Sequence, residues 1–139
     1  MRNILFFALF VIFSLNSHAL DINKACQEFS EQKEALLSNL STSLTEANMA
    51  GQCIGYRAVI NKVRLSVYKA CAEYIEQQES LLGNFSTSLK EANKAGQCLG
   101  AIYAACGPGD FNYSAERIVS HGLINANSPS LKRIAGCHG

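Results

Sequence analysis

The feature that most constrains this chain is an internal duplication. Residues 25–55 recur 45 positions later as residues 70–100, and the two copies share 21 identical residues in 31. The cysteines and glycines of the first copy all stand at the same places in the second. Similarity at this level identifies one structural unit that is used twice. Two units are too few for a solenoid, so the duplication predicts a compact pair rather than an open array.

Each copy has the pattern of two helices separated by a short polar turn. Residues 20–106 contain no proline, are rich in helix-forming side chains, and place their apolar residues at helical spacing. Ser43 and Ser88 each stand three positions before a glutamate, an arrangement that forms a capping box and marks the start of a helix. The first helix of each copy is expected to end at residues 38–39 and 83–84.

The predicted fold is all-α. A duplicated helical hairpin forms a four-helix core, and a short helical C-terminal tail follows over residues 106–139. The crossover between the hairpins falls near residues 61–68 and is either a bend or a continued helix. In the tail, Ser114 is expected to cap one short helix. Ser128-Pro129 is expected to begin another, with proline at its first position and Gly136 just past its end.

A ridge of small residues runs along the second helix of each copy. Its members stand at intervals of four: Ala47, Gly51 and Gly55, then Ala92, Gly96, Gly100 and Ala104. Glycine inside a helix costs about 1 kcal/mol relative to alanine, so its recurrence at matched places predicts a close approach of two backbones. The same spacing occurs in dimers of membrane helices. The amide side chains alongside favour packing inside a bundle instead; they belong to Asn48, Gln52, Asn93 and Gln97.

The start of the chain has the pattern of a signal peptide, over residues 1–19. Arg2 precedes an apolar run at residues 4–15, and Ser17-His18-Ala19 offers small residues at the positions that signal peptidase reads. The run is shorter than the roughly 20 residues of a membrane span, although an uncleaved anchor is the alternative. Cleavage would leave one helical domain over residues 20–139. The protein is therefore expected to be exported, periplasmic or secreted, and not held in a membrane after cleavage.

All six cysteines lie in the predicted mature chain. An even number in a short exported chain indicates disulfides, because such compartments are oxidising. A zinc site would need closely spaced pairs such as Cys-x-x-Cys, which the sequence lacks, so no metal and no cofactor are expected. The cysteines are Cys26, Cys53, Cys71, Cys98, Cys106 and Cys137.

Hairpin geometry suggests how these cysteines pair. The turn divides each hairpin so that its two cysteines fall at similar heights on antiparallel helices, and the tail cysteines are then left for each other. The favoured pairs are Cys26–Cys53, Cys71–Cys98 and Cys106–Cys137. A crossed scheme between the hairpins, Cys26–Cys98 with Cys53–Cys71, has the same symmetry and stays open.

Charge and residue chemistry argue against several function classes. The chain has 12 Lys plus Arg and 11 Asp plus Glu, a balance that argues against a nucleic-acid partner. No set of acid, base and nucleophile stands out, so the protein is not expected to be an enzyme. The first helix of each copy carries three glutamates, which favour a solvated face or, as the sharper hypothesis, an acidic docking surface for a basic partner. These glutamates are Glu28, Glu31, Glu34, Glu73, Glu76 and Glu79.

Short motifs resemble a known family. Gly51-Gln52-Cys53-Ile54-Gly55-Tyr56 is similar to the Gly-x-Cys-x-Gly-Tyr helix of the periplasmic Rap/Tai-type immunity proteins, which neutralise peptidoglycan-cleaving toxins delivered by type VI secretion. The second copy keeps both glycines and the cysteine, with Ala101 in place of the tyrosine. Cys106-Gly107-Pro108 resembles that family's Cys-x-Pro segment, and a tail that closes on Cys137 resembles its C-terminus. The resemblance covers residues 71–137 best.

The resemblance implies an immunity protein that binds one envelope protein, a peptidoglycan amidase toxin, and blocks its cleft. The polar turns are expected to make the contact, because exposed tips on a stapled hairpin lose little entropy on binding. The alternative is a secreted, disulfide-rich helical binding module or host-directed effector of unknown target, and a homodimer is compatible with either. The expected contact residues in the turns are Asn39, Ser41, Thr42, Ser43, Asn84, Ser86, Thr87 and Ser88.

Overall fold

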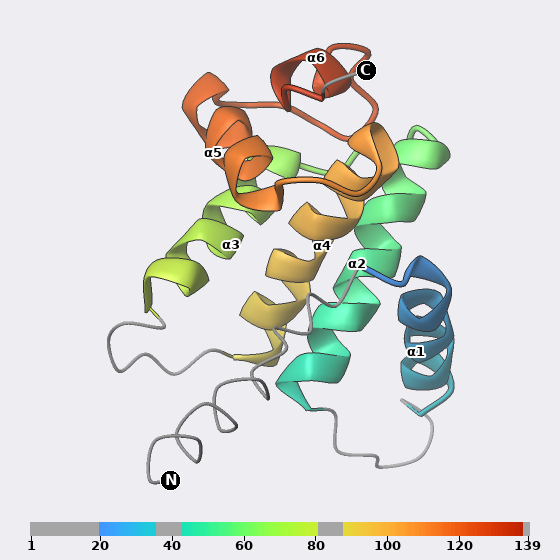
Figure 1. The fold of residues 1–139 in the computed structure, drawn as a ribbon. Coiled ribbons are helices and arrows are strands. Elements are labelled where there is room, and N and C mark those ends of the chain that lie inside the picture. Colours follow the sequence, from blue (N-terminus) through green and yellow to red (C-terminus); the bar gives the residue numbers. More distant parts are fainter. Residues whose placement is uncertain (1–19, 36–42, 81–87, 138–139) are drawn as a thin grey trace, which may run out of the picture.

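The computed structural model describes residues 20–35, 43–80 and 88–137, and these residues form an all-helical fold (Figure 1). The helices are α1 (Ile22–Ala35), α2 (Leu44–Ile60), α3 (Val67–Ser80), α4 (Leu89–Cys106), α5 (Phe111–His121) and α6 (Leu131–Ile134). The predicted four-helix core, its two hairpins and its helical tail are therefore confirmed. The expected signal sequence and the expected ends of both first helices lie outside the described residues.

Capping boxes start the second helix of each hairpin, as predicted. The backbone N–H of Glu46 donates to the Ser43 hydroxyl at 3.2 Å, and the Ser43 N–H donates to the Glu46 carboxylate at 2.7 Å. Ser88 and Glu91 form the same two bonds at the same two distances. Each box satisfies backbone donors that a helix start would otherwise leave unpaired.

The central element of the core is the pair of second helices, α2 and α4, which run side by side in the same direction (Figure 1). A Cβ atom added to Gly51 would overlap the carbonyl of Asn93, and one added to Gly96 would overlap the carbonyl of Asn48. The next glycine of each ridge meets the partner helix in the same reciprocal way. The predicted close approach of backbones is thus confirmed, and it relates the two hairpins by a pseudo-twofold axis along the helix pair.

Amide side chains fix the register of this pair. The Asn48 amide donates to the carbonyl of Ala92 at 3.2 Å, and the Asn93 amide donates to the carbonyl of Ala47 at 3.1 Å. Sliding one helix along the other would break both bonds. It would also move the carbonyls that now face glycines toward residues with side chains. The contact therefore specifies a single alignment.

The three disulfides join the pairs that hairpin geometry favours, and the crossed scheme is excluded. Cys26–Cys53 ties α1 to α2 with 4.8 Å between the Cα atoms, and Cys71–Cys98 ties α3 to α4 with 4.7 Å. Cys106–Cys137 fixes the tail to the end of α4. Such bridges are typical of proteins from oxidising compartments.

The crossover between the hairpins is a bend. α2 ends with Asn61 as its cap, and Lys62 follows with a φ of 52°, in the left-handed region. Leu65 and Val67 then pair with the tail: the Val67 N–H donates to the carbonyl of Ile124 at 3.0 Å, and the Ala126 N–H donates to the carbonyl of Leu65 at 2.8 Å.

The tail packs on the second hairpin and completes its core. α5 lies against α3, and α6 lies against α4 and α5 (Figure 1). Ile102, Ile118 and Val67 are among the largest fully enclosed side chains. The hydrophobic core therefore belongs mainly to the second hairpin and the tail.

Two expectations for the tail are wrong in detail. α5 begins three residues before Ser114, because Asp110 is its N-cap and accepts from the N–H of Tyr113 at 3.0 Å; Ser114 is buried inside the helix. α6 is a single turn that begins at Leu131, with Ser130 in the cap position, so Pro129 precedes the helix rather than opening it. Gly136, with a φ of 72°, does follow the helix end.

Candidate functional site

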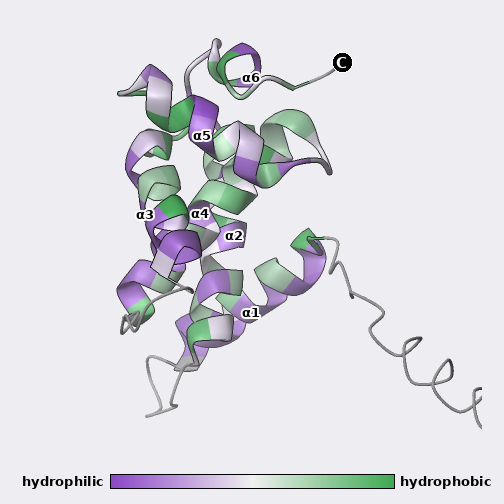
Figure 2. Cartoon of the chain, turned by 60° about the vertical axis from the view of Figure 1, so that its left-hand side comes forward, coloured by the Kyte–Doolittle hydropathy of each residue, from purple (hydrophilic) through white to green (hydrophobic). Residues whose placement is uncertain are grey.

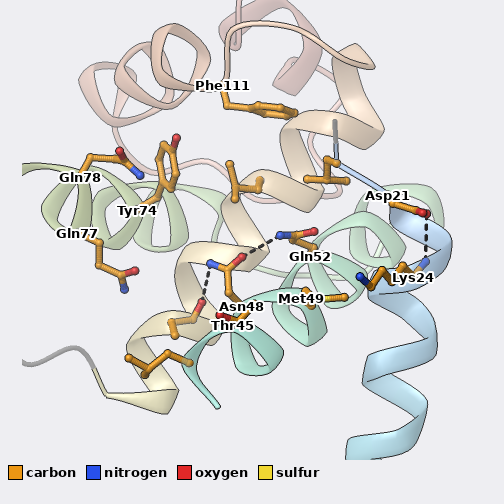
Figure 3. Close-up of a pocket in the computed structure, with 14 residues that line it drawn as sticks. Asp21, Lys24, Thr45, Asn48, Met49, Gln52, Tyr74, Gln77, Gln78 and Phe111 are labelled. Atoms are coloured by element: carbon orange, nitrogen blue, oxygen red, sulfur yellow. Dashed lines mark hydrogen bonds between the residues drawn. The ribbon is translucent and has the colours of Figure 1, made fainter. Parts of the chain in front are cut away.

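One face of the central helix pair carries a groove of about 770 Å³ (Figure 3). α2 and α4 form its floor, α3 forms one wall, and the start of α1 closes the opposite side. Phe111, at the start of α5, closes one end. This volume lies within the range of small-ligand sites, about 300–1,000 Å³, and accommodates one inserted chain segment equally well.

Two amide side chains of α2 line the floor of the groove. Asn48 is held by its bond to α4, and its amide oxygen accepts from the Gln52 side chain at 2.8 Å. The side-chain amide oxygen of Gln52 accepts no hydrogen bond from any described residue. Gln52 thus offers an acceptor, and its second amide hydrogen as a donor, to whatever enters the groove.

The α3 wall combines an aromatic ring with two further amides. Burial raises the pKa of Tyr74, and the nearby negative charge of Asp110 raises it further, so the phenol stays protonated. Its hydroxyl donates to the Asn112 side chain at 2.5 Å, which holds the ring at the groove edge. Gln77 and Gln78 lie beside it, and Gln78 has no hydrogen bond to another described residue.

The rest of the lining is mostly apolar. Its uncharged members are Leu44, Thr45 and Met49 of α2, Ala92 and Leu99 of α4, and Leu20 before α1. The charged side chains in the lining are Asp21 and Lys24, which have opposite signs. Asp21 also caps α1, because its carboxylate accepts from the N–H groups of Asn23 and Lys24 at 3.1 Å each. The groove is therefore close to neutral and best suited to an uncharged ligand with apolar groups and hydrogen-bonding atoms.

The duplication does not give the opposite face the same chemistry. The pseudo-twofold axis places the matching amides, Asn93 and Gln97, on the other side of the helix pair. There the positions that match Thr45 and Met49 hold Lys90 and Lys94. The neutral groove is thus a property of one face, created by the differences between the copies.

The glutamates expected to form an acidic docking surface do not line the groove. Glu28 and Glu31 accept from glutamine side chains of their own helix at 3.1 and 2.9 Å, and Glu73 accepts from Gln77 at 3.4 Å. Glu34, Glu76 and Glu79 are exposed. α1 and α3 lie on opposite flanks of the central pair, so the glutamates form two separate faces (Figure 1).

The turn residues expected to contact a partner fall mostly outside the described residues. Ser43 and Ser88 are described, and both are exposed and engaged in capping boxes. The positions outside the described residues are Asn39, Ser41, Thr42, Asn84, Ser86 and Thr87.

The described residues offer no cluster of three or more His, Cys, Asp or Glu side chains arranged to hold a metal ion. Among the described helices, none combines the length and apolar character of a membrane span.

Sequence reasoning missed the groove. The sequence pattern places Asn48 and Gln52 beside the glycine ridge and indicates packing inside a bundle, and it singles out neither them nor Tyr74 as binding residues. Spacing within one helix cannot show that Tyr74 and Phe111 line the same groove. No family model, curated protein or solved structure matches this chain.

Proposed function

We propose that this protein is an exported, non-catalytic binding protein that holds a segment of one envelope protein in the groove between α2, α3 and α4. The observation that carries the proposal is the groove itself, with its partly apolar lining, the open side-chain acceptor of Gln52 and the amide of Gln78, which bonds to no other described residue. An extended protein segment supplies apolar side chains together with backbone N–H and C=O groups, which side-chain amides bind well.

The disulfides support a binding role because they prepare the groove in advance. Cys71–Cys98 fixes the α3 wall against α4, and Cys26–Cys53 fixes α1 against α2. A site that is rigid before binding loses little conformational entropy when its ligand arrives. The same bridges suit a protein that works outside the reducing cytoplasm.

The resemblance to Rap/Tai-type immunity proteins supplies the candidate partner, a peptidoglycan amidase toxin of the cell envelope. In this proposal a surface segment of the toxin enters the groove, and the bulk of the helical domain covers the toxin's cleft. The glutamates on the flanks, such as Glu31 and Glu76, steer a basic rim toward the complex.

Growth protection tests this function. Cells that export an amidase encoded beside this gene should grow when the protein is co-expressed and should lyse without it. Thr45→Lys with Met49→Lys should abolish protection, because the two ammonium groups enter the neutral groove. The fold should tolerate the change, since the second copy carries lysine at both matching positions.

The matched control makes the reverse exchange on the opposite face, Lys90→Thr with Lys94→Met, and should leave protection intact. Killing that continues in the presence of the exported, folded wild-type protein would end the immunity hypothesis. Equal protection by both double variants would show that the groove is not the contact.

A further inference from the structure

The first hairpin, formed by α1 and α2, docks on the rest of the molecule mainly through the α2–α4 pair, and Ala58 near the end of α2 joins the core beside the tail. α1 packs on α2, and α2 packs on α4 (Figures 1 and 2). The Cys26–Cys53 bridge ties the two helices together, so the hairpin can move as one body without losing its internal structure.

The face of α4 on which this hairpin packs is shaped for one kind of helix. Gly96 and Gly100 leave no room for a Cβ atom between α4 and the facing carbonyls, and Asn93 needs a carbonyl at a set height. A helix with the sequence of α2 satisfies all of these requirements. A second copy of this chain carries that helix.

The turn that holds the hairpin in place is short and strained. Residues 61–64 are exposed, and they connect α2 to a segment that the tail fixes in place. Lys62 has a φ of 52°, a conformation that costs L-residues free energy and that glycine adopts readily. Opening the turn releases this strain, and a short strained hinge favours exchange of an element between copies.

Opening of the turn in two copies would also allow apolar side chains at the turn to be buried. Ile60 is 55% exposed and Val63 is 53% exposed, although both are large and hydrophobic. Two opened hinges that run past each other would cover these side chains, and burial of apolar surface is favourable.

We propose that two copies of this chain exchange their first hairpins and form a dimer in which α2 of each copy packs on α4 of the other. Each half of the dimer then contains the same α2–α4 contact as the monomer. Each groove becomes composite, with Asn48 and Gln52 from one chain facing Tyr74 and Gln78 from the other. The proposal does not depend on the identity of the partner protein.

Variants at Lys62 test the exchange by size-exclusion chromatography with light scattering on the disulfide-bonded protein. Lys62→Pro cannot adopt a positive φ and should convert the protein mostly to dimer. Lys62→Gly removes the strain and should lower the dimer-to-monomer ratio about five-fold relative to wild type. Arg64→Gly, a control at a hinge position without a positive φ, should leave the ratio within about two-fold of wild type.

Cross-linking distinguishes exchange from simple association. In dimers assembled from isotopically light and heavy chains, a link between Lys33 of the first hairpin and Lys94 of α4 should join a light chain to a heavy one. Links confined to single chains would overturn the proposal. So would wild-type and Lys62→Pro proteins that both stay monomeric while folded. If Lys62→Pro fails to fold, the ratio of wild type to Lys62→Gly decides: equal dimer fractions contradict the exchange.

Discussion

The two hairpins share most of their sequence and differ in what covers them. In the second, Tyr68 and Ile75 pack against the core and Ile102 is 2% exposed, all beneath the tail. The matching positions of the first hairpin hold Asn23, Ser30 and Arg57, and all three are exposed.

This difference shows which positions of the duplicated unit can differ in sequence between the two copies and which cannot. The small residues and amides of the central pair are identical in both copies, because each helix needs them to fit the other. The outer positions have different surroundings in the two copies. They are apolar in the second copy, where the tail covers them, and polar in the first copy, where they face solvent. Figure 2 shows α1 at the edge of the molecule, largely in the hydrophilic colour. Arg57 lies over the ring of Phe29, 5.6 Å from its centroid, and covers part of it.

Truncation at one matched position should show the largest contrast. Ile102→Ala should lower the free energy of unfolding by about 3 kcal/mol, because it leaves a cavity in the core. Arg57→Ala, its counterpart in the first hairpin, should cost about 0.5 kcal/mol, the value of an exposed contact with a ring. Chemical denaturation of both variants measures the contrast. Equal losses would mean that the two hairpins have similar surroundings.

The shared parts should respond equally. Ser43→Ala and Ser88→Ala each remove a capping-box acceptor and should each cost about 1 kcal/mol. The two losses should agree closely, since the bonds are the same in both copies. Thermal melts of the two variants check this, and a clear difference would argue against equivalent second helices.

The capping box of the second hairpin should also leave a small pH signature. Hydrogen bonds from the Ser88 backbone and side chain lower the pKa of Glu91. The stability that this carboxylate contributes is therefore present above its unfolded pKa and is lost as the pH falls through its folded pKa. Glu91→Gln should remove that dependence in melts recorded across acidic pH. A carboxyl titration by NMR that gives Glu91 an ordinary or raised pKa would contradict the assignment.

Much of this fold follows from local chemistry and symmetry, which is why the sequence predicts it. The serine–glutamate spacing marks where α2 and α4 begin, and matched cysteines on antiparallel helices leave few sensible pairings. The start of α5 was harder to predict from the sequence, because Asp110 and Ser114 are both good N-cap residues. The packing of α5 on α3 favours the helix that begins after Asp110. The groove was not predictable at all, because side chains from α1, α2, α3, α4 and α5 combine to line it.

Hydrogen exchange of backbone amides tests the central claim most directly: the two hairpins share one interior contact and differ in their cover. Amides of α2 and α4 in the contact, from Ala47 to Gly55 and from Ala92 to Gly100, should be protected to a similar degree, since neither helix can open there without the other. Amides of α3, under the tail, should exchange more slowly than those of α1. Equal protection of α1 and α3, or an α2 that exchanges far faster than α4, would contradict this account.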